Sequence, residues 1–173
     1  MVAFPTRNDS SRGVTKITHV VLHSTAGGAS SWAGEEQGTV GWFQNPDSGA
    51  SSHVVVPRTK LEVWRFVPDG LAAWTVERFN PSSLNLEFVH RAPRSSSPEE
   101  RVTDSQLERG AWQVARWCKL YGVPAERASW DVPGIIGHGD LPPVFNTHGH
   151  VDPGLFFDWD RFFYWLHRWL EIV

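Results

Sequence analysis

The sequence predicts an α/β fold, on the borderline with α+β, in which helices flank a mixed central β-sheet. Three patterns indicate this fold: apolar runs of strand length lie in the first half of the chain, a long helical repeat follows them, and a second helical segment lies near the end. Strands with helices between and after them are typical of a sheet covered by helices. The chain has 173 residues, a usual size for one domain, so we expect residues 1–173 to form a single domain.

The chain opens with an expected irregular segment, followed by a strand and a helix. Residues 1–14 are polar and contain several turn formers, so we expect them to be mostly irregular. Residues 17–22 are β-branched and apolar and predict a buried strand, which places His23 at its carboxyl end. A helix is expected from about residue 38 to residue 45, where a proline follows.

Further strand signals occupy the middle of the chain. Residues 52–56 and 61–67 are strand-like, and the short turn between them predicts a hairpin. Residues 83–89 alternate in character, which predicts one apolar and one polar face. The apolar face would hold Leu84, Leu86 and Phe88, and the polar face Asn85 and Glu87.

The second half of the chain is mainly helical. Residues 91–100 are rich in Ser and Pro and predict a surface loop. Residues 103–121 carry apolar side chains at helical spacing, and Thr103 with Gln106 matches a capping box. Cys118 lies on the apolar stripe of this helix and is expected to be a small core residue. A last helix is expected from about residue 159 to residue 170.

Charge and composition exclude several classes of protein. The net charge of −3, without a block of like charges, argues against nucleic-acid binding and against docking to an anionic membrane. No apolar run reaches the length of about 18 residues that a transmembrane helix needs, so no stable membrane association is expected. The first residues lack the basic and apolar regions of a signal peptide, which predicts synthesis in the cytoplasm without one. The ten tryptophans either fill the core or line a groove for a sugar or a peptide.

Three polar residues suggest a metal site. His23, His138 and Asp152 all lie at ends of apolar segments, where a scaffold presents side chains to a cleft. A catalytic zinc ion takes about three ligands of the imidazole and carboxylate kind and leaves a fourth position open. The wide sequence spacing is not that of a compact zinc finger, so spacing alone leaves the alternative of hydrogen-bonded structural histidines open.

Six short motifs carry a family resemblance. In order along the chain they are Val20-Val-Leu-His23-Ser-Thr25, Ser52-His53-Val-Val55, Ala73-Trp74, Leu84-Asn-Leu-Glu87, Ile136-Gly-His138-Gly-Asp140 and Asp152-Pro-Gly154. Together they resemble the N-acetylmuramoyl-L-alanine amidase type 2 family, which includes phage endolysins, bacterial muropeptide amidases and animal peptidoglycan recognition proteins. The resemblance covers roughly residues 17–170 and is greatest to a single-domain phage endolysin or its catalytic portion.

The resemblance implies a set of site residues. It assigns one zinc ion per chain to His23, His138 and Asp152, and it places Glu87 at the position of a catalytic carboxylate. It makes His150 a partner of the developing oxyanion. We further expect His53, Trp74 and Asn85 to bind substrate. The alternative for His53 is a structural role at the floor of the cleft. Asn85 and Asp140 are also candidates to orient the ligating groups.

The sequence departs from the family pattern at two positions. The family often has Lys where this chain has His150, and often has His where this chain has Thr75. The lysine is proposed to stabilise the oxyanion, whereas a histidine is cationic only when protonated. His148 and His150 both lie near Asp152 in sequence, so either one is an alternative third ligand. A structural ion pair is the alternative role for Glu87.

The function implied by the resemblance is zinc-dependent hydrolysis of the amide between N-acetylmuramic acid and L-alanine in peptidoglycan. Residues 1–173 would then be one zinc amidase catalytic domain, monomeric, with peptidoglycan or a muropeptide as its partner. A phage endolysin made in the host cytoplasm would serve host cell lysis and would need a separate, holin-like route to the wall. The alternatives are a non-catalytic peptidoglycan-binding recognition module and a zinc peptidase that cuts within the stem peptide.

Overall fold

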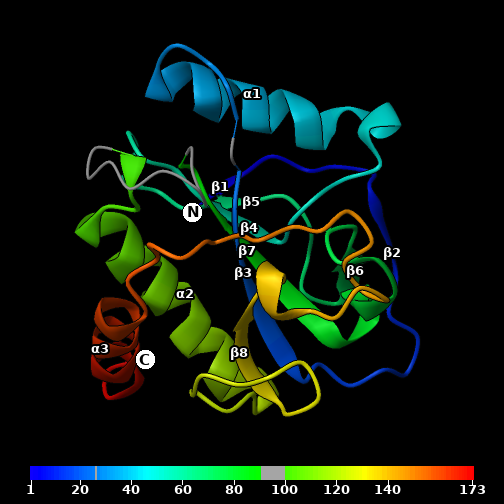
Figure 1. Cartoon of the computed structure of the whole chain (residues 1–173), viewed down its shortest axis with the longest axis vertical. Coiled ribbons are helices and arrows are strands. Elements are labelled where there is room, and N and C mark those ends of the chain that lie inside the picture. The colour runs from blue at the N-terminus through cyan, green and yellow to red at the C-terminus, as the bar shows by residue number, and fades with distance from the viewer. Residues whose placement is uncertain (26, 91–99) are drawn as a thin grey trace.

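A mixed six-stranded β-sheet forms the centre of the protein, and the computed structural model describes residues 1–25, 27–90 and 100–173 around it (Figure 1). The strand order is β1-β5-β4-β7-β3-β8, and β2 and β6 form a second, two-stranded sheet. The pairs β1/β5, β4/β7, β7/β3 and β3/β8 are parallel and β4/β5 is antiparallel, so the expected mixed sheet is confirmed. The strands are β1 (Val2–Ala3), β2 (Asp9–Ser11), β3 (His19–Ser24), β4 (Val54–Val56), β5 (Trp64–Arg65), β6 (Leu71–Ala73), β7 (Ser83–Phe88) and β8 (Gly134–Gly137).

Within the described residues, three α-helices flank the sheet, as the sequence predicts. In Figure 1, α2 and α3 lie together on one side of the sheet, whereas α1 lies apart from them. The helices are α1 (Trp32–Gln44), α2 (Asp104–Tyr121) and α3 (Trp159–Leu170), with short 3-10 segments at η1 (Pro46–Ser48), η2 (Glu77–Ser82) and η4 (His138–Asp140). No helix in the described ranges is long and apolar enough to cross a membrane.

The register of the central strands separates two faces of the sheet. In the β3/β7 pair, Leu22 lies opposite Leu86, and His23 lies opposite Glu87. Paired residues of adjacent strands project to the same face, and successive residues project to opposite faces. One face therefore carries the apolar side chains that pack on α2 and α3, and the other carries polar side chains such as His23 and Glu87 beside apolar ones such as Val21 and Ile136. The apolar face contributes Val20, Leu22, Val54, Val56, Leu84, Leu86, Phe88 and Ile135 to one buried cluster.

The helix α2 is capped at both ends and is hydrogen-bonded to the sheet region at its N-terminal end. Thr103 accepts a hydrogen bond from the backbone of Gln106, and the Gln106 side chain accepts one from the Thr103 backbone, which confirms the capping box. Gln106 has no exposed surface, and its Nε2 donates to the carbonyl oxygens of Val56 and Val89 at 3.2 and 3.0 Å. Gly122 ends the helix in a left-handed conformation. Cys118 is 6% exposed and belongs to the core, as predicted.

The N-terminal segment differs from the prediction. Residues 1–14 are only partly irregular, because β1 adds a parallel edge to β5 and β2 pairs with β6. Both strands are only two or three residues long, so their pairing depends on partners far along the chain. Two buried side chains reinforce it: Asn8 donates to the Asn45 and Ala50 carbonyls, and Arg12 donates to the Pro81 carbonyl at 2.7 Å.

The start of α1 also differs from the prediction. The helix α1 begins at Trp32 rather than near residue 38, because Ser31 caps it by accepting a hydrogen bond from the Gly34 backbone. The two faces predicted for residues 83–89 are present in β7: Leu84, Leu86 and Phe88 enter the core, Asn85 and Glu87 share the opposite face, and all six residues of the strand are buried. The Ser/Pro-rich surface loop predicted for residues 91–100 lies outside the described residues, apart from Glu100.

A glycine at the contact between α2 and the sheet gives the first testable prediction. A Cβ atom at Gly110 would approach Phe88 Cζ to 2.6 Å, whereas at Gly41 in α1 it would meet no atom within 4 Å. We expect Gly110→Ala to lower the free energy of unfolding by about 1–3 kcal/mol through overpacking. The control Gly41→Ala should raise it by up to about 1 kcal/mol through helix propensity. Urea denaturation measures both, and an unchanged stability of Gly110→Ala would contradict the close packing.

Candidate metal centre and its cavity

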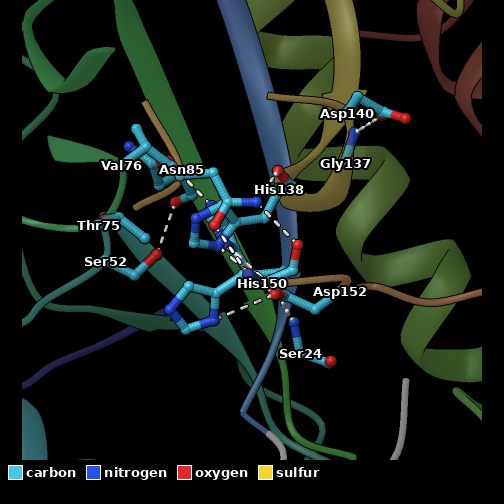
Figure 2. Close-up of polar contacts among 12 residues, drawn as sticks. Ser24, Ser52, Thr75, Val76, Asn85, Gly137, His138, Asp140, His150 and Asp152 are labelled. Atoms are coloured by element: carbon cyan, nitrogen blue, oxygen red, sulfur yellow. Dashed lines mark hydrogen bonds and ion pairs between the residues drawn. The ribbon is translucent and has the colours of Figure 1, made fainter. Parts of the chain in front are cut away.

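Three buried side chains converge at the carboxyl ends of the parallel strands. His23 lies near the end of β3, His138 directly follows β8, and Asp152 lies in the loop before α3; they are 1%, 5% and 6% exposed. His23 Nδ1 lies 3.2 Å from His138 Nδ1 and 3.2 Å from Asp152 Oδ2, and His138 Nδ1 lies 3.4 Å from Asp152 Oδ1. Figure 2 shows His138 and Asp152 gathered at this point, with His150 beside them.

The geometry of these three groups fits a zinc ion. Zinc binds such donors at about 2.0–2.1 Å, and tetrahedral geometry then places neighbouring donor atoms about 3.3–3.4 Å apart. The two imidazole nitrogens lie 3.2 Å apart, and each lies 3.2–3.4 Å from a different oxygen of Asp152. With one ligand atom from each residue, the three atoms all lie within 4.8 Å of one another, close enough to share one ion. His23 Nε2 lies 3.0 Å from Asn85 Oδ1, which can only accept, so Nε2 carries the proton and the Nδ1 lone pair faces the other two groups. Among the described residues, these are the ones that could hold a metal ion as a group of three.

Charge around Asp152 favours its ionised form. Burial raises the pKa of Asp152, but the neighbouring imidazoles of His138 and His23 outweigh burial and hold its pKa well below the usual range. The Ser24 backbone N–H also donates to Asp152 Oδ2, at 3.3 Å. Burial lowers the pKa of His138 and so favours a neutral imidazole. An ionised carboxylate and neutral imidazoles are the forms that bind metal.

Glu87 stands next to this group on the same face of the sheet. It lies opposite His23 in the β3/β7 register, is 7% exposed and lines the same cavity. Burial, with a smaller contribution from the negative charge of Asp152, raises the pKa of Glu87 well above its usual value. In the described part of the chain its Oε2 atom is buried without a hydrogen-bond partner. This placement does not match the alternative of a structural ion pair.

The two other histidines of the loop occupy different positions. The His150 ring stacks on the His138 ring with centroids 4.4 Å apart and an interplanar angle of 16°, and its side chain is 50% exposed. His150 Nδ1 lies 3.7 Å from Asp152 Oδ1, farther than the donor atoms of His23 and His138. His148 is exposed and meets the edge of the His150 ring. These positions favour Asp152 over either histidine as the third ligand.

Two residues expected to bind substrate are instead buried behind the site. Neither His53 nor Asn85 has exposed surface. Asn85 contacts His23 through Oδ1, and its backbone N–H donates to His53 Nδ1 at 2.9 Å. The Arg12 guanidinium lies 2.6 Å from His53 Nε2. Their burial does not support direct substrate contact, and it does support orientation of His23 by Asn85 and a structural role for His53.

Asp140 supports the turn that carries His138 rather than the imidazole itself. Its Oδ2 atom accepts a hydrogen bond from the Gly137 backbone at 2.5 Å and forms an ion pair with Arg127 at 2.7 Å. The guanidinium of Arg127 in turn lies 4.0 Å from the centroid of the Trp159 ring. The expected orienting role of Asp140 therefore applies to the backbone at the end of β8.

The candidate ligands open into a cavity of about 880 Å³. Trp74, which the sequence predicts to bind substrate, lines it, and so does Trp42 of α1, which is 55% exposed. Trp42 lies within the predicted helix of residues 38–45, but the sequence there carries no signal that this side chain faces a cavity. Other lining residues are Ser24, Thr25, Glu35, Thr39, Phe43, Ser51, Thr75, His148 and His150. Sequence reasoning also missed the buried Asn146, since a lone asparagine in a loop carries no distinguishing signal.

Comparison with known proteins now identifies the family. A family model described as N-acetylmuramoyl-L-alanine amidase matches residues 13–155. The chain therefore belongs to the type 2 family of N-acetylmuramoyl-L-alanine amidases, and this membership supports amidase activity on peptidoglycan. N-acetylmuramoyl-L-alanine amidase A of Achromobacter lyticus is 25% identical over 151 residues, which cover 83% of this chain and 80% of that protein. The resemblance found in the sequence is thus confirmed.

Solved structures show the same fold. The hydrolase AmiA of Staphylococcus aureus, determined with its ligand, matches with a TM-score of 0.69 at 20% identity, over 99% of this chain and 83% of that one. A derivative of AmpD matches with a TM-score of 0.67 at 19% identity, over 95% and 93%. The Ph2119 endolysin of a Thermus scotoductus bacteriophage matches with a TM-score of 0.58 at 18% identity, over 92% and 90%.

The burial of His53 makes a prediction about stability and pH. Burial, and then the charge of Arg12, lower the pKa of His53 from 6.5 to about 3 in the folded protein. Below pH 6.5 the unfolded chain binds a proton on this residue and the folded protein does not, so the free energy of unfolding falls as the pH falls towards 3. Between about pH 7 and about pH 5, the wild type should lose roughly 2 kcal/mol more stability than His53→Gln. Urea denaturation at both pH values tests this, and equal losses would show that His53 is protonated in the folded protein.

Proposed function

We propose that this chain is a zinc-dependent N-acetylmuramoyl-L-alanine amidase that hydrolyses the amide between N-acetylmuramic acid and the L-alanine of the stem peptide. The observation that carries the proposal is the convergence of His23, His138 and Asp152 beside Glu87 at the floor of an open cavity. Family membership supplies the bond type, and the donor set and its spacing support zinc, one ion per chain.

The metal and Glu87 would divide the chemistry between them. A zinc ion bound by these residues supplies Lewis-acid catalysis, which polarises the scissile carbonyl and makes water more acidic. Glu87, opposite His23, accepts a proton from the attacking water and returns it to the nitrogen of the leaving amine. Burial raises the pKa of Glu87 well above its usual value, which makes the ionised carboxylate a stronger proton acceptor than an exposed one.

His150 is the proposed partner of the oxygen on which negative charge develops. Its ring lies against His138, and its half-exposed side chain lines the cavity. Burial lowers the pKa of His150, so the neutral imidazole acts as a hydrogen-bond donor rather than as a fixed cation. A directed donor of this kind stabilises the transition state more than the substrate. Trp74, at the cavity wall, is the proposed contact for the sugar or the peptide of the substrate.

A role in host cell lysis extends the proposal to biology. The fold matches the Ph2119 endolysin and the catalytic domain of PlyG, the latter with a TM-score of 0.60 at 14% identity. We propose that this chain is a phage endolysin acting as a monomer. Its net charge of −3 is consistent with peptidoglycan rather than nucleic acid as its partner.

Product analysis of a defined muropeptide tests the reaction. We expect the zinc-loaded protein to release an intact stem peptide with a free L-alanine amine, and a chelator to abolish this release until zinc is restored. Mass spectrometry identifies the products, and metal analysis of the protein measures the zinc stoichiometry. Cleavage inside the stem would indicate a peptidase, and wall binding without stoichiometric zinc or product would indicate a recognition module.

Substitution of Glu87 tests its role as proton carrier. Glu87→Gln keeps the size of the side chain and removes its basicity, so kcat should fall roughly 10²- to 10⁴-fold while zinc stays bound. The matched control is Glu36→Gln. Glu36 is also buried, but its carboxylate accepts hydrogen bonds from Thr59 and does not line the cavity. The control should lose stability and keep its kcat. Full activity of Glu87→Gln would rule out the assigned role.

A further inference from the structure

A buried asparagine binds both backbone groups of His150. Asn146 is 7% exposed and lies in the loop between η4 and α3. Its Nδ2 donates to the His150 carbonyl at 2.8 Å, and its Oδ1 accepts from the His150 backbone N–H at 2.8 Å. The same Nδ2 lies 3.5 Å from the His138 carbonyl. One amide side chain thus links the backbone of His150 to the backbone at the candidate metal centre.

The rest of the loop holds this asparagine in place. The Gly139 N–H donates to the Asp152 carbonyl at 2.9 Å and closes the base of the loop, and the Gly149 N–H donates to the Asn146 carbonyl at 3.2 Å. Gly149 has a φ of 65°, which an L-residue adopts at a cost. The backbone around Asn146 therefore has a defined turn, and its side chain points to the backbone of His150.

A second contact fixes the neighbouring residue. The Thr147 N–H donates to Glu77 Oε1 at 3.1 Å, and the Thr147 hydroxyl also donates to that oxygen. Glu77 has a φ of 51°, an unusual value for a residue other than glycine. Both groups are exposed, so this contact is worth less than the buried one. The loop is nevertheless anchored to η2 on one side of Asn146 and to η4 on the other.

The consequence concerns the orientation of the His150 ring. Half of the His150 side chain is exposed, so the side chain alone has little packing to fix it. The backbone clamp determines where the side chain leaves the chain, and with it the stacking on His138 at 4.4 Å and the approach to Asp152 at 3.7 Å. A hydrogen-bond donor must be held close to its productive position, because small displacements cost much of its effect on rate.

We propose that Asn146 is a positioning residue that holds the His150 imidazole over the candidate metal centre, so that it meets the substrate oxygen in the amidase reaction. The inference rests on the proposed function for its effect on rate, but not for the geometry it describes. Asn146 touches no reacting atom in this scheme and acts through His150. Its effect on the reaction should therefore vanish when the imidazole is absent.

A double-mutant cycle on muropeptide hydrolysis tests the proposal. We expect Asn146→Ala to lower kcat roughly 10- to 100-fold, with zinc affinity unchanged in a chelator competition. In a His150→Ala background, the same substitution should lower kcat less than about 2-fold, because the two residues act as one unit. Asn146→Asp should not rescue activity, since its carboxylate cannot donate to the His150 carbonyl.

The control is a buried asparagine elsewhere in the chain. Asn8 is 1% exposed and also donates to backbone carbonyls, those of Asn45 and Ala50. Any reduction of kcat by Asn8→Ala should be the same in the wild type and in the His150→Ala background, since loss of a structural contact does not depend on the imidazole. Additive behaviour of Asn146→Ala, or a loss of zinc affinity that accounts for its lower rate, would overturn the proposal.

An NMR experiment that does not depend on catalytic activity separates this inference from the proposed function. The ring protons of His150 should show a ring-current shift from the stacked His138 in the NMR spectrum of the wild type. Asn146→Ala should move them towards the values of an unstructured histidine, whereas Asn8→Ala should leave them in place. Unchanged His150 signals in Asn146→Ala would refute the positioning role even if the wild type proved inactive. An inactive wild type with the expected shifts would refute the amidase proposal alone.

Discussion

The pairing register between β3 and β7 is the constraint on which the site depends. It sets His23 opposite Glu87 and Val21 opposite Asn85 on one face, while the alternate residues enter the core. A shift of one residue in either strand would turn its polar side chains into the apolar cluster under α2 and α3. The hydrophobic core therefore also determines the strand register. Burying a carboxylate or an imidazole among apolar side chains would be costly, and this cost selects the register in which His23, Glu87 and Asn85 share the other face.

The same arrangement explains why so many ionisable groups can be buried together. Asp152 keeps its charge because two imidazoles and a backbone N–H face it. Glu87, only one strand away, lies in surroundings that raise its pKa. Two carboxyl groups at one site thus differ in their tendency to ionise, and the difference arises from their neighbours rather than from their chemistry. A bound cation would add the charge that this cluster is arranged to accept.

Sequence reasoning recovered the parts whose signals are local. The apolar run of β3, the capping box of α2 and the motifs around His23 and His138 all lie within a few residues, and the structure bears out the elements they predict. The short strands β1 and β2 escaped prediction because distant partners create them. The burial of His53 and Asn85 escaped it for a related reason: alternation along one strand shows which residues share a face, but not whether another layer covers that face.

The clamp formed by Asn146 has a consequence for how this site can change over generations. Asn146 binds the main chain of residue 150 and makes no demand on the side chain there. The loop therefore fixes the backbone position of residue 150, and the side chain at that position determines which chemical group faces the substrate. The resemblance to a family that often has lysine at this position agrees with such freedom. Because both hydrogen bonds reach main-chain atoms, they would remain available with a lysine at position 150, and the charge offered to the cavity would change while the loop backbone kept its support.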